Sequence, residues 1–294
     1  MLTDRSRHRL VALALVVLAL SAFEQAFERL GAWALVRAPN ARRLIPAPEP
    51  GERRVAVGPP PATLSVTVLE PRLPPRATIL VLHGIRDQKD FLRHVGLQLS
   101  EAGYRAVLVD SRGHGRSTGT YLTWGIQEAR DLSQLVDALG YGDSPLGVFG
   151  ESYGAAVAIL WSASDARVRA AVALAPFSSL RELVPDWWRL NLPLVGRWLP
   201  RWILNRSIDE GAHLAGFDPD AASPLQAAAR SHAPILIMHG RDDVTVAFRE
   251  SESIAARAPD RVTLLPLDGQ DHDHLAFDPR LMPVALDFFG RAFK

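Results

Sequence analysis

The chain has 294 residues, of which 48% are apolar and 22% charged, and its 33 Lys and Arg residues nearly balance its 32 Asp and Glu residues. This composition excludes a disordered chain, which needs low hydrophobicity and high net charge, and it predicts no nucleic-acid partner because no excess of basic residues is present. Because the chain contains no cysteine, disulfides, thiolate catalysis and cysteine-ligated metals are excluded as well. Only Lys89 and Lys294 among the basic residues are lysine, a bias typical of GC-rich bacterial codon usage.

The chain begins with a short basic stretch followed by an uncharged apolar run at residues 10–23. This order is typical of a secretory signal, but 14 residues are too few to cross a bilayer alone, which takes about 20. Three interpretations remain: an uncleaved membrane anchor, a signal peptide cleaved near Ser21, and a buried N-terminal helix. We therefore expect residues 1–37 to be a targeting or anchor segment of a membrane-anchored or exported protein. Arginines on both sides of the run leave the orientation open.

Residues 38–62 are dense in proline and arginine. Such a composition is typical of a stiff, solvated linker. The folded domain is therefore expected to begin near Thr63 and to cover residues 63–294.

Beyond Thr63, short apolar runs alternate with stretches of helical spacing. The apolar runs are residues 63–70, 77–84, 104–110, 146–150, 168–175, 234–240 and 262–267, and helical spacing marks residues 125–140 and 152–164. Near-continuous apolar strands separated by helices are typical of a mostly parallel sheet that is buried on both faces. The predicted fold class is α/β, with helices on both faces of the central sheet and a strandless insertion at about residues 177–232.

A candidate nucleophile lies in the sequence Gly-Glu-Ser-Tyr-Gly at residues 150–154. A nucleophilic serine needs a tight turn from a strand into a helix, and small residues two positions before and after it allow that turn to close. A second match with Ser117 at its centre occupies residues 115–119, but it lies several residues beyond its strand and precedes no helical pattern. Context therefore favours Ser152, and Ser117 is expected to be a loop residue.

A serine hydroxyl needs a histidine base and an acid that orients the histidine. Asp242 and Asp243 follow the strand at residues 234–240, and His272 and His274 follow the last strand. Both turns lie at the carboxyl ends of strands, the edge at which a parallel sheet presents its functional loops. The order of serine, aspartate and histidine is the one expected of a hydrolase triad. A metal site in this second turn is disfavoured because no further ligand set accompanies the two histidines.

Together, several motifs resemble those of the serine α/β-hydrolase superfamily, closest to its monoglyceride-lipase-like and serine-aminopeptidase-like branch. These motifs are HGI at 83–85, DSRGHGRS at 110–117, GESYG at 150–154, HGRDD at 239–243 and GQDH at 269–272. The resemblance covers about residues 63–292 and implies the α/β-hydrolase fold with a helical cap at the insertion. It also implies Asp243 as the acid, His272 as the base, and the backbone N–H groups of Ile85 and Tyr153 as oxyanion donors. It implies no cofactor and no metal.

The function implied is hydrolysis of a carboxylic ester through an acyl-enzyme. The insertion is rich in tryptophan and leucine, which favours a small-molecule substrate with a hydrophobic acyl group. Its mixture of arginine and tryptophan, together with residues 10–36, also predicts association with a membrane. The alternatives are a peptidase, amidase or thioesterase with the same triad, and a non-catalytic binding protein of the same fold.

Overall fold

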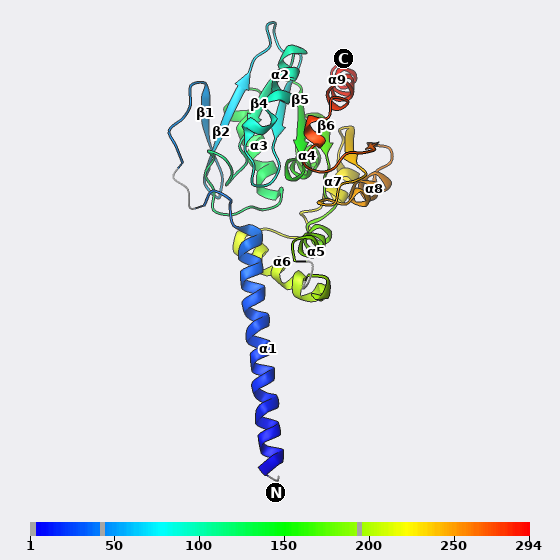
Figure 1. Cartoon of the computed structure of the whole chain (residues 1–294). Helices are drawn as coiled ribbons and strands as arrows, with labels where there is room; N and C mark the ends of the chain where they lie inside the picture. The colour runs from blue at the N-terminus through cyan, green and yellow to red at the C-terminus, as the bar shows by residue number, and fades with distance from the viewer. Residues whose placement is uncertain (1–3, 42–44, 193–195) are drawn as a thin grey trace.

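A computed structural model describes residues 4–41, 45–192 and 196–294 of the chain (Figure 1). Within them, eight strands form one sheet in the order β1-β2-β4-β3-β5-β6-β7-β8. The strands are β1 (Glu52–Val57), β2 (Ala62–Leu69), β3 (Thr78–Leu82), β4 (Arg105–Val109), β5 (Leu146–Glu151), β6 (Val168–Leu174), β7 (Ile235–Gly240) and β8 (Val262–Leu267). Strands β3 to β8 run parallel, and β1 and β2 are antiparallel to their neighbours. The predicted α/β fold class is confirmed.

Helices cover both faces of the sheet because successive side chains of a strand point to opposite faces. In β3, Leu80 and Leu82 belong to one core cluster, whereas Ile79 and Val81 belong to the other. The first cluster includes residues of α3 (Ile126–Ala138), α4 (Tyr153–Ser164), α7 (Pro224–Arg230) and α8 (Phe248–Arg257). The second includes residues of α2 (Arg93–Glu101) and α9 (Leu281–Ala292), and two short 3-10 turns, η1 (Lys89–Leu92) and η3 (Leu275–Phe277), flank these helices.

The stretch predicted to be a linker, residues 38–62, instead contains strand β1. This edge strand pairs antiparallel with β2, and its Val55 and Val57 are buried in the core. Upstream of it, the side-chain amide of Asn40 donates to the carbonyl oxygen of Ser117 at 2.5 Å. The prediction that the folded domain begins near Thr63 is therefore wrong. The two exposed arginines at the start of β1 and the prolines around it obscured a short strand of which only Val55 and Val57 are buried.

Helix α1 (Asp4–Val36) is a single long helix whose amino-terminal part extends away from the rest of the molecule (Figure 1). Its carboxyl-terminal part packs against α6 (Arg201–Ala215), where small residues allow a close approach. A Cβ atom at Gly31 would lie 3.0 Å from Ser207 Oγ, and one at Gly211 would lie 3.0 Å from the carbonyl oxygen of Ala32. None of the described helices, α1 among them, is both long and apolar enough to span a membrane.

Charged and aromatic side chains also hold α1 against α6 and against α5 (Leu180–Asn191). Arg206 on α6 forms ion pairs with Glu24 at 2.5 Å and with Glu28 at 3.1 Å. The ring of Phe27 lies 5.1 Å from that of Trp188, centroid to centroid. Part of the segment predicted to be a separate targeting sequence is therefore packed against the insertion.

The insertion lies between β6 and β7, and its described residues form helices only. It contains α5 (Leu180–Asn191), the 3-10 turn η2 (Gly196–Trp198), α6 and α7. Two of its apolar residues, Leu194 and Val195, lie outside the described residues. Helices α5 and α6 lie at the end of the molecule where α1 joins it (Figure 1).

Candidate active site

Ser152 lies at a sharp turn between β5 and α4. Its backbone adopts φ 51° and ψ −111°, a conformation that residues other than glycine rarely adopt. The turn closes so tightly that a Cβ atom at Gly150 would lie 2.2 Å from the carbonyl oxygen of Gly154, and one at Gly154 would lie 2.4 Å from that of Leu82. Both glycines of the motif are therefore required sterically, and the turn lifts the Ser152 hydroxyl above the carboxyl edge of the sheet.

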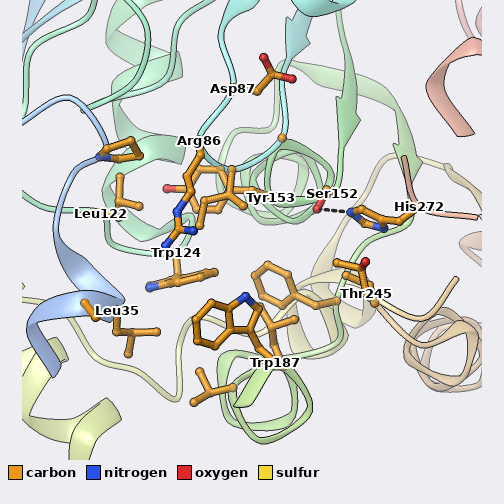
Figure 2. A pocket seen from close by; sticks show the side chains of 18 of the residues that line it. Leu35, Arg86, Asp87, Leu122, Trp124, Ser152, Tyr153, Trp187, Thr245 and His272 are labelled. Atoms are coloured by element: carbon orange, nitrogen blue, oxygen red, sulfur yellow. Dashed lines mark hydrogen bonds between the residues drawn. The ribbon is translucent and has the colours of Figure 1, made fainter. Parts of the chain in front are cut away.

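The structure brings Ser152, His272 and Asp243 into one chain of hydrogen bonds. His272 Nε2 lies 3.0 Å from Ser152 Oγ (Figure 2), and His272 Nδ1 lies 2.6 Å from Asp243 Oδ2. The geometry fits a neutral imidazole whose Nδ1–H donates to the carboxylate and whose Nε2 accepts from the hydroxyl. This is the arrangement needed to remove a proton from serine.

Asp243 is held by three further hydrogen bonds, one from the end of β7 and two from the turn that follows it. The backbone N–H groups of Thr245 and Val246 donate to its Oδ1 at 2.9 and 2.8 Å. His239 Nε2 lies 3.2 Å from its Oδ2, while His239 Nδ1 lies 2.6 Å from Ser251 Oγ. The sequence analysis did not predict that His239 positions Asp243. The location of His239 at the end of a buried strand, as the first residue of the HGRDD motif, could have indicated this role.

The alternative residues for the acid, the base and the nucleophile all lie away from this hydrogen-bond chain. Asp242 is exposed, and His274 is 78% exposed and paired with Asp271. Ser117 is fully buried, donates to the carbonyl oxygen of Asp110 at 2.6 Å and accepts from the backbone N–H of Ser65 at 2.8 Å. Ser117 therefore stabilises a loop, and none of these three residues contacts Ser152.

The charges around His272 set its protonation behaviour. Burial by itself would raise the pKa of Asp243, but hydrogen bonds from His239 and His272 lower that pKa to about 2. Burial would also lower the pKa of His272, yet the hydrogen bond and charge of Asp243, with the charge of Glu151, raise it above its ordinary value. The imidazolium form that arises during proton transfer is therefore stabilised.

Glu151, the residue before the nucleophile, is a second feature that sequence reasoning missed. It is buried, and its Oε2 has no hydrogen-bond partner among the described residues. Burial raises the pKa of this carboxyl to about 7, opposed by the charge of His272 and assisted by those of Asp87 and Asp273. Glu151 occupies a position of the Gly-x-Ser-x-Gly motif at which any residue is allowed, so the motif did not indicate that its side chain is buried.

The two expected oxyanion donors both border the nucleophile. Ile85 follows β3, and Tyr153 is the first residue of α4, where the backbone N–H groups of a helix lack partners within that helix. Both residues line the same cavity as Ser152. Their backbone groups can therefore point toward a carbonyl oxygen that is attacked by the serine.

This cavity has a volume of about 790 Å³ and walls from distant parts of the chain (Figure 2). Leu35 comes from the end of α1, Trp187 from α5, Trp124 from the loop before α3, and His272 from the turn after β8. Most of the named wall is apolar, with the nucleophile at one side. The end of α1 is thus part of the candidate site rather than a separate segment.

Proteins with sequences similar to this chain include hydrolases. Residues 73–215 match the family described as serine aminopeptidase. An uncharacterized protein of Bacillus subtilis is 28% identical over 60% of this chain and 58% of its own length. The lysophosphatidylserine lipase of Macaca fascicularis is 27% identical over 74% of this chain and 56% of its own length. The chain thus spans little more than half the length of these two relatives.

Solved structures share the fold over most of the chain. An esterase of Pyrococcus furiosus superposes with a TM-score of 0.66 at 23% identity, covering 86% of this chain and 97% of the esterase. Est1E of Butyrivibrio proteoclasticus, solved with ferulic acid bound, gives a TM-score of 0.61 at 17% identity, covering 81% of this chain and 98% of that protein. At these identities the likeness concerns the fold, while the sequence matches above support a hydrolase. The chain has the α/β-hydrolase fold, and its matches support the α/β-hydrolase superfamily and, within it, the monoglyceride-lipase-like branch.

Proposed function

We propose that the protein is a serine hydrolase that cleaves carboxylic esters with hydrophobic acyl groups. The observation that carries the proposal is the unbroken hydrogen-bond chain from Ser152 through His272 to Asp243 at the side of an apolar cavity. In the sequence matches and fold neighbours, esterases and a lipase recur, which supports the same reaction class.

The proposed reaction is a two-step acyl transfer. Ser152 Oγ attacks the ester carbonyl carbon as His272 Nε2 takes the hydroxyl proton, and Asp243 holds the imidazolium. The backbone N–H groups of Ile85 and Tyr153 bind the oxyanion, and one such donor typically contributes about 3 to 4 kcal/mol to transition-state stabilisation. His272 then gives its proton to the departing alcohol, and water, activated by the same imidazole, releases the acid.

A peptidase is the second candidate, because the matched family is described as serine aminopeptidase. The triad fixes acyl transfer but not the leaving group, so an ester, a thioester and an amide would all be attacked in the same way. The apolar wall with Leu35 and Trp187 favours an acyl chain over a peptide.

The reaction class is tested with nitrophenyl esters of increasing acyl length beside aminoacyl nitroanilides. We expect turnover of the esters to increase with chain length and the anilides to react far more slowly, because the apolar cavity binds the chain. Ser152→Ala should lower ester turnover by about 10⁴-fold or more and abolish labelling by a fluorophosphonate probe. Ser253→Ala, at an exposed position on α8, is the matched control. A wild-type protein that neither labels nor hydrolyses any substrate would favour the non-catalytic binding protein.

The acid and the base are tested by neighbouring pairs of variants. Asp243→Asn should lower kcat by about 10⁴-fold, because the imidazole loses the carboxylate that orients it, whereas Asp242→Asn should keep full activity. His272→Ala should likewise abolish turnover, and His274→Ala should not. The measurement is steady-state hydrolysis of one nitrophenyl ester by folded variants. Loss of activity in Asp242→Asn or His274→Ala alone would reverse the assignments.

The pH profile follows from the raised pKa of His272. The base must be neutral, so kcat/KM should rise with pH through a midpoint above 6.5. Because the negative charge of Glu151 contributes to that raised pKa, Glu151→Gln should shift the midpoint to lower pH. Asp287→Asn, an exposed change on α9, serves as the control and should leave the midpoint in place. A midpoint that stays fixed or moves upward in Glu151→Gln would contradict this coupling.

We further propose that the amino-terminal part of α1 binds a lipid surface. Leu13 and Leu18 are 61% and 64% exposed, with Leu15 and Val16 exposed between them, and no described residue covers this stretch. Burying exposed apolar side chains at a bilayer interface is favourable. Together with the apolar cavity, this stretch supports a membrane-associated protein that acts on lipid-like esters.

Co-sedimentation of the full chain with phosphatidylcholine vesicles tests this association. The double variant Leu13→Glu, Leu18→Glu should weaken vesicle binding at least tenfold, because two leucines no longer enter the interface and two charges oppose entry. Leu73→Glu, at a leucine between β2 and β3 that is 77% exposed, is the control and should bind as the wild type does. Equal binding of all three proteins, or no binding by the wild type, would refute the proposal.

A further inference from the structure

Two arginines, Arg37 and Arg86, line the cavity that contains Ser152. Neither guanidinium forms an ion pair or a side-chain hydrogen bond with any described residue. Other arginines near the site are paired: Arg112 makes a buried, two-pronged contact with Asp131, with bonds of 2.8 and 2.7 Å. The cavity wall thus carries two positive charges that the protein itself does not neutralise.

Backbone conformation and an aromatic ring hold these arginines in place. Arg86 adopts φ 64°, the left-handed region that residues with a side chain seldom occupy. Its side chain runs toward Trp124, whereas the adjacent Asp87 points the other way (Figure 2). The guanidinium carbon of Arg37 lies 4.3 Å from the ring centre of Trp33, and its backbone N–H donates to the carbonyl oxygen of Trp33 at 3.0 Å.

The acidic groups of the cavity are engaged around the base. Glu151 and Asp273 both act on His272 electrostatically, and the Asp87 carboxylate accepts a hydrogen bond from the backbone N–H of Gln88 at 2.8 Å. The charges of Glu151 and Asp273 therefore act on His272, and the Arg86 side chain points away from Asp87. The cavity has an apolar wall, an acidic side at the base, and two unpaired guanidinium groups.

We propose that Arg86, assisted by Arg37, binds a phosphate or carboxylate group of the substrate, so that the preferred substrate is an anionic amphiphilic ester. A guanidinium binds such oxyanions through two parallel hydrogen bonds. Arg86 directly follows the oxyanion donor Ile85, and consecutive Cα atoms are about 3.8 Å apart. The backbone of Arg86 therefore adjoins the oxyanion donor, and its side chain extends toward Trp124 along the cavity wall, where it can bind an anionic group on the same ester while the acyl chain contacts Leu35 and Trp187. This inference rests on the proposed ester hydrolysis.

Matched substrates with the same dodecanoyl chain test the proposal, used below micelle-forming concentrations. In the phosphate arm, 1-dodecanoylglycerol 3-phosphate is compared with 1-dodecanoylglycerol. In the carboxylate arm, the dodecanoyl ester of glycolate is compared with that of glycolamide. We expect the wild type to favour the anionic member of at least one pair, and the arm with the larger preference identifies the anion.

Variants of Arg86 and Arg37 then test whether these side chains cause the preference for the anionic ester. Arg86→Gln should lower the ratio of kcat/KM for the anionic ester to that for the neutral ester at least tenfold, mainly through KM. Arg37→Gln should lower the same ratio less, and Arg86→Lys should keep part of it. Arg93→Gln, an exposed arginine on α2 outside the cavity, should leave the ratio unchanged.

Dodecyl phosphate, which carries no ester, gives a second measurement that needs no turnover of an anionic substrate. It should inhibit hydrolysis of 1-dodecanoylglycerol competitively, with an inhibition constant at least tenfold higher in Arg86→Gln. Equal effects of Arg86→Gln on both members of each pair, or no preference in the wild type, would overturn the proposal. Failure to hydrolyse either member of both pairs would instead refute the proposed function.

Discussion

The whole site depends on the close approach of β5, α4 and β3 at Ser152. The backbone of α4 passes so near to β5 that Gly150 has no room for a side chain, and so near to the end of β3 that Gly154 has none either. This closeness holds Ser152 in its unusual conformation, and it also places Tyr153 at the start of a helix beside the end of β3. One steric constraint therefore positions the nucleophile and both oxyanion donors, because Ile85 lies just beyond β3.

The remaining part of the triad depends on charge rather than on steric fit. Asp243 accepts four hydrogen bonds, two from backbone N–H groups and one from each of two histidines. A carboxylate so well satisfied stays ionised although its side chain is buried, which explains why its pKa is lowered to about 2. Its charge in turn keeps His272 in the orientation that leaves Nε2 free to face Ser152. Glu151 adds a second, weaker influence because its own charge state varies near neutral pH.

Much of this could be predicted from the sequence, for physical reasons. The seven strands from β2 onward are predominantly apolar, so each appears as a recognisable run, and the three triad residues follow such runs within a few positions. Strand β1 was not predicted because only its last three residues alternate between buried and exposed positions, and they follow two exposed arginines beside a proline-rich stretch. The environments of Glu151 and Arg86 could not be predicted either. Whether a side chain is buried or has a hydrogen-bonding partner depends on which distant segments of the chain meet around it.

The role of α1 shows most clearly what contacts add to sequence patterns. As an apolar run, the amino-terminal segment is compatible with a signal, an anchor and a buried helix. These interpretations differ in how removal of the segment would affect the rest of the structure. The ion pairs of Arg206 with Glu24 and Glu28 and the ring contact of Phe27 all lie beyond Ser21. Cleavage at the small-residue site near Ser21 would therefore leave the packing on α6 and the cavity wall intact, whereas loss of all residues to 37 would remove Leu35 and open the cavity. The segment thus has two parts, an exposed apolar stretch suited to a lipid surface and a packed stretch that shapes the site. A single continuous helix joins them, so a lipid surface that holds the first part would also lie at a fixed distance from the cavity.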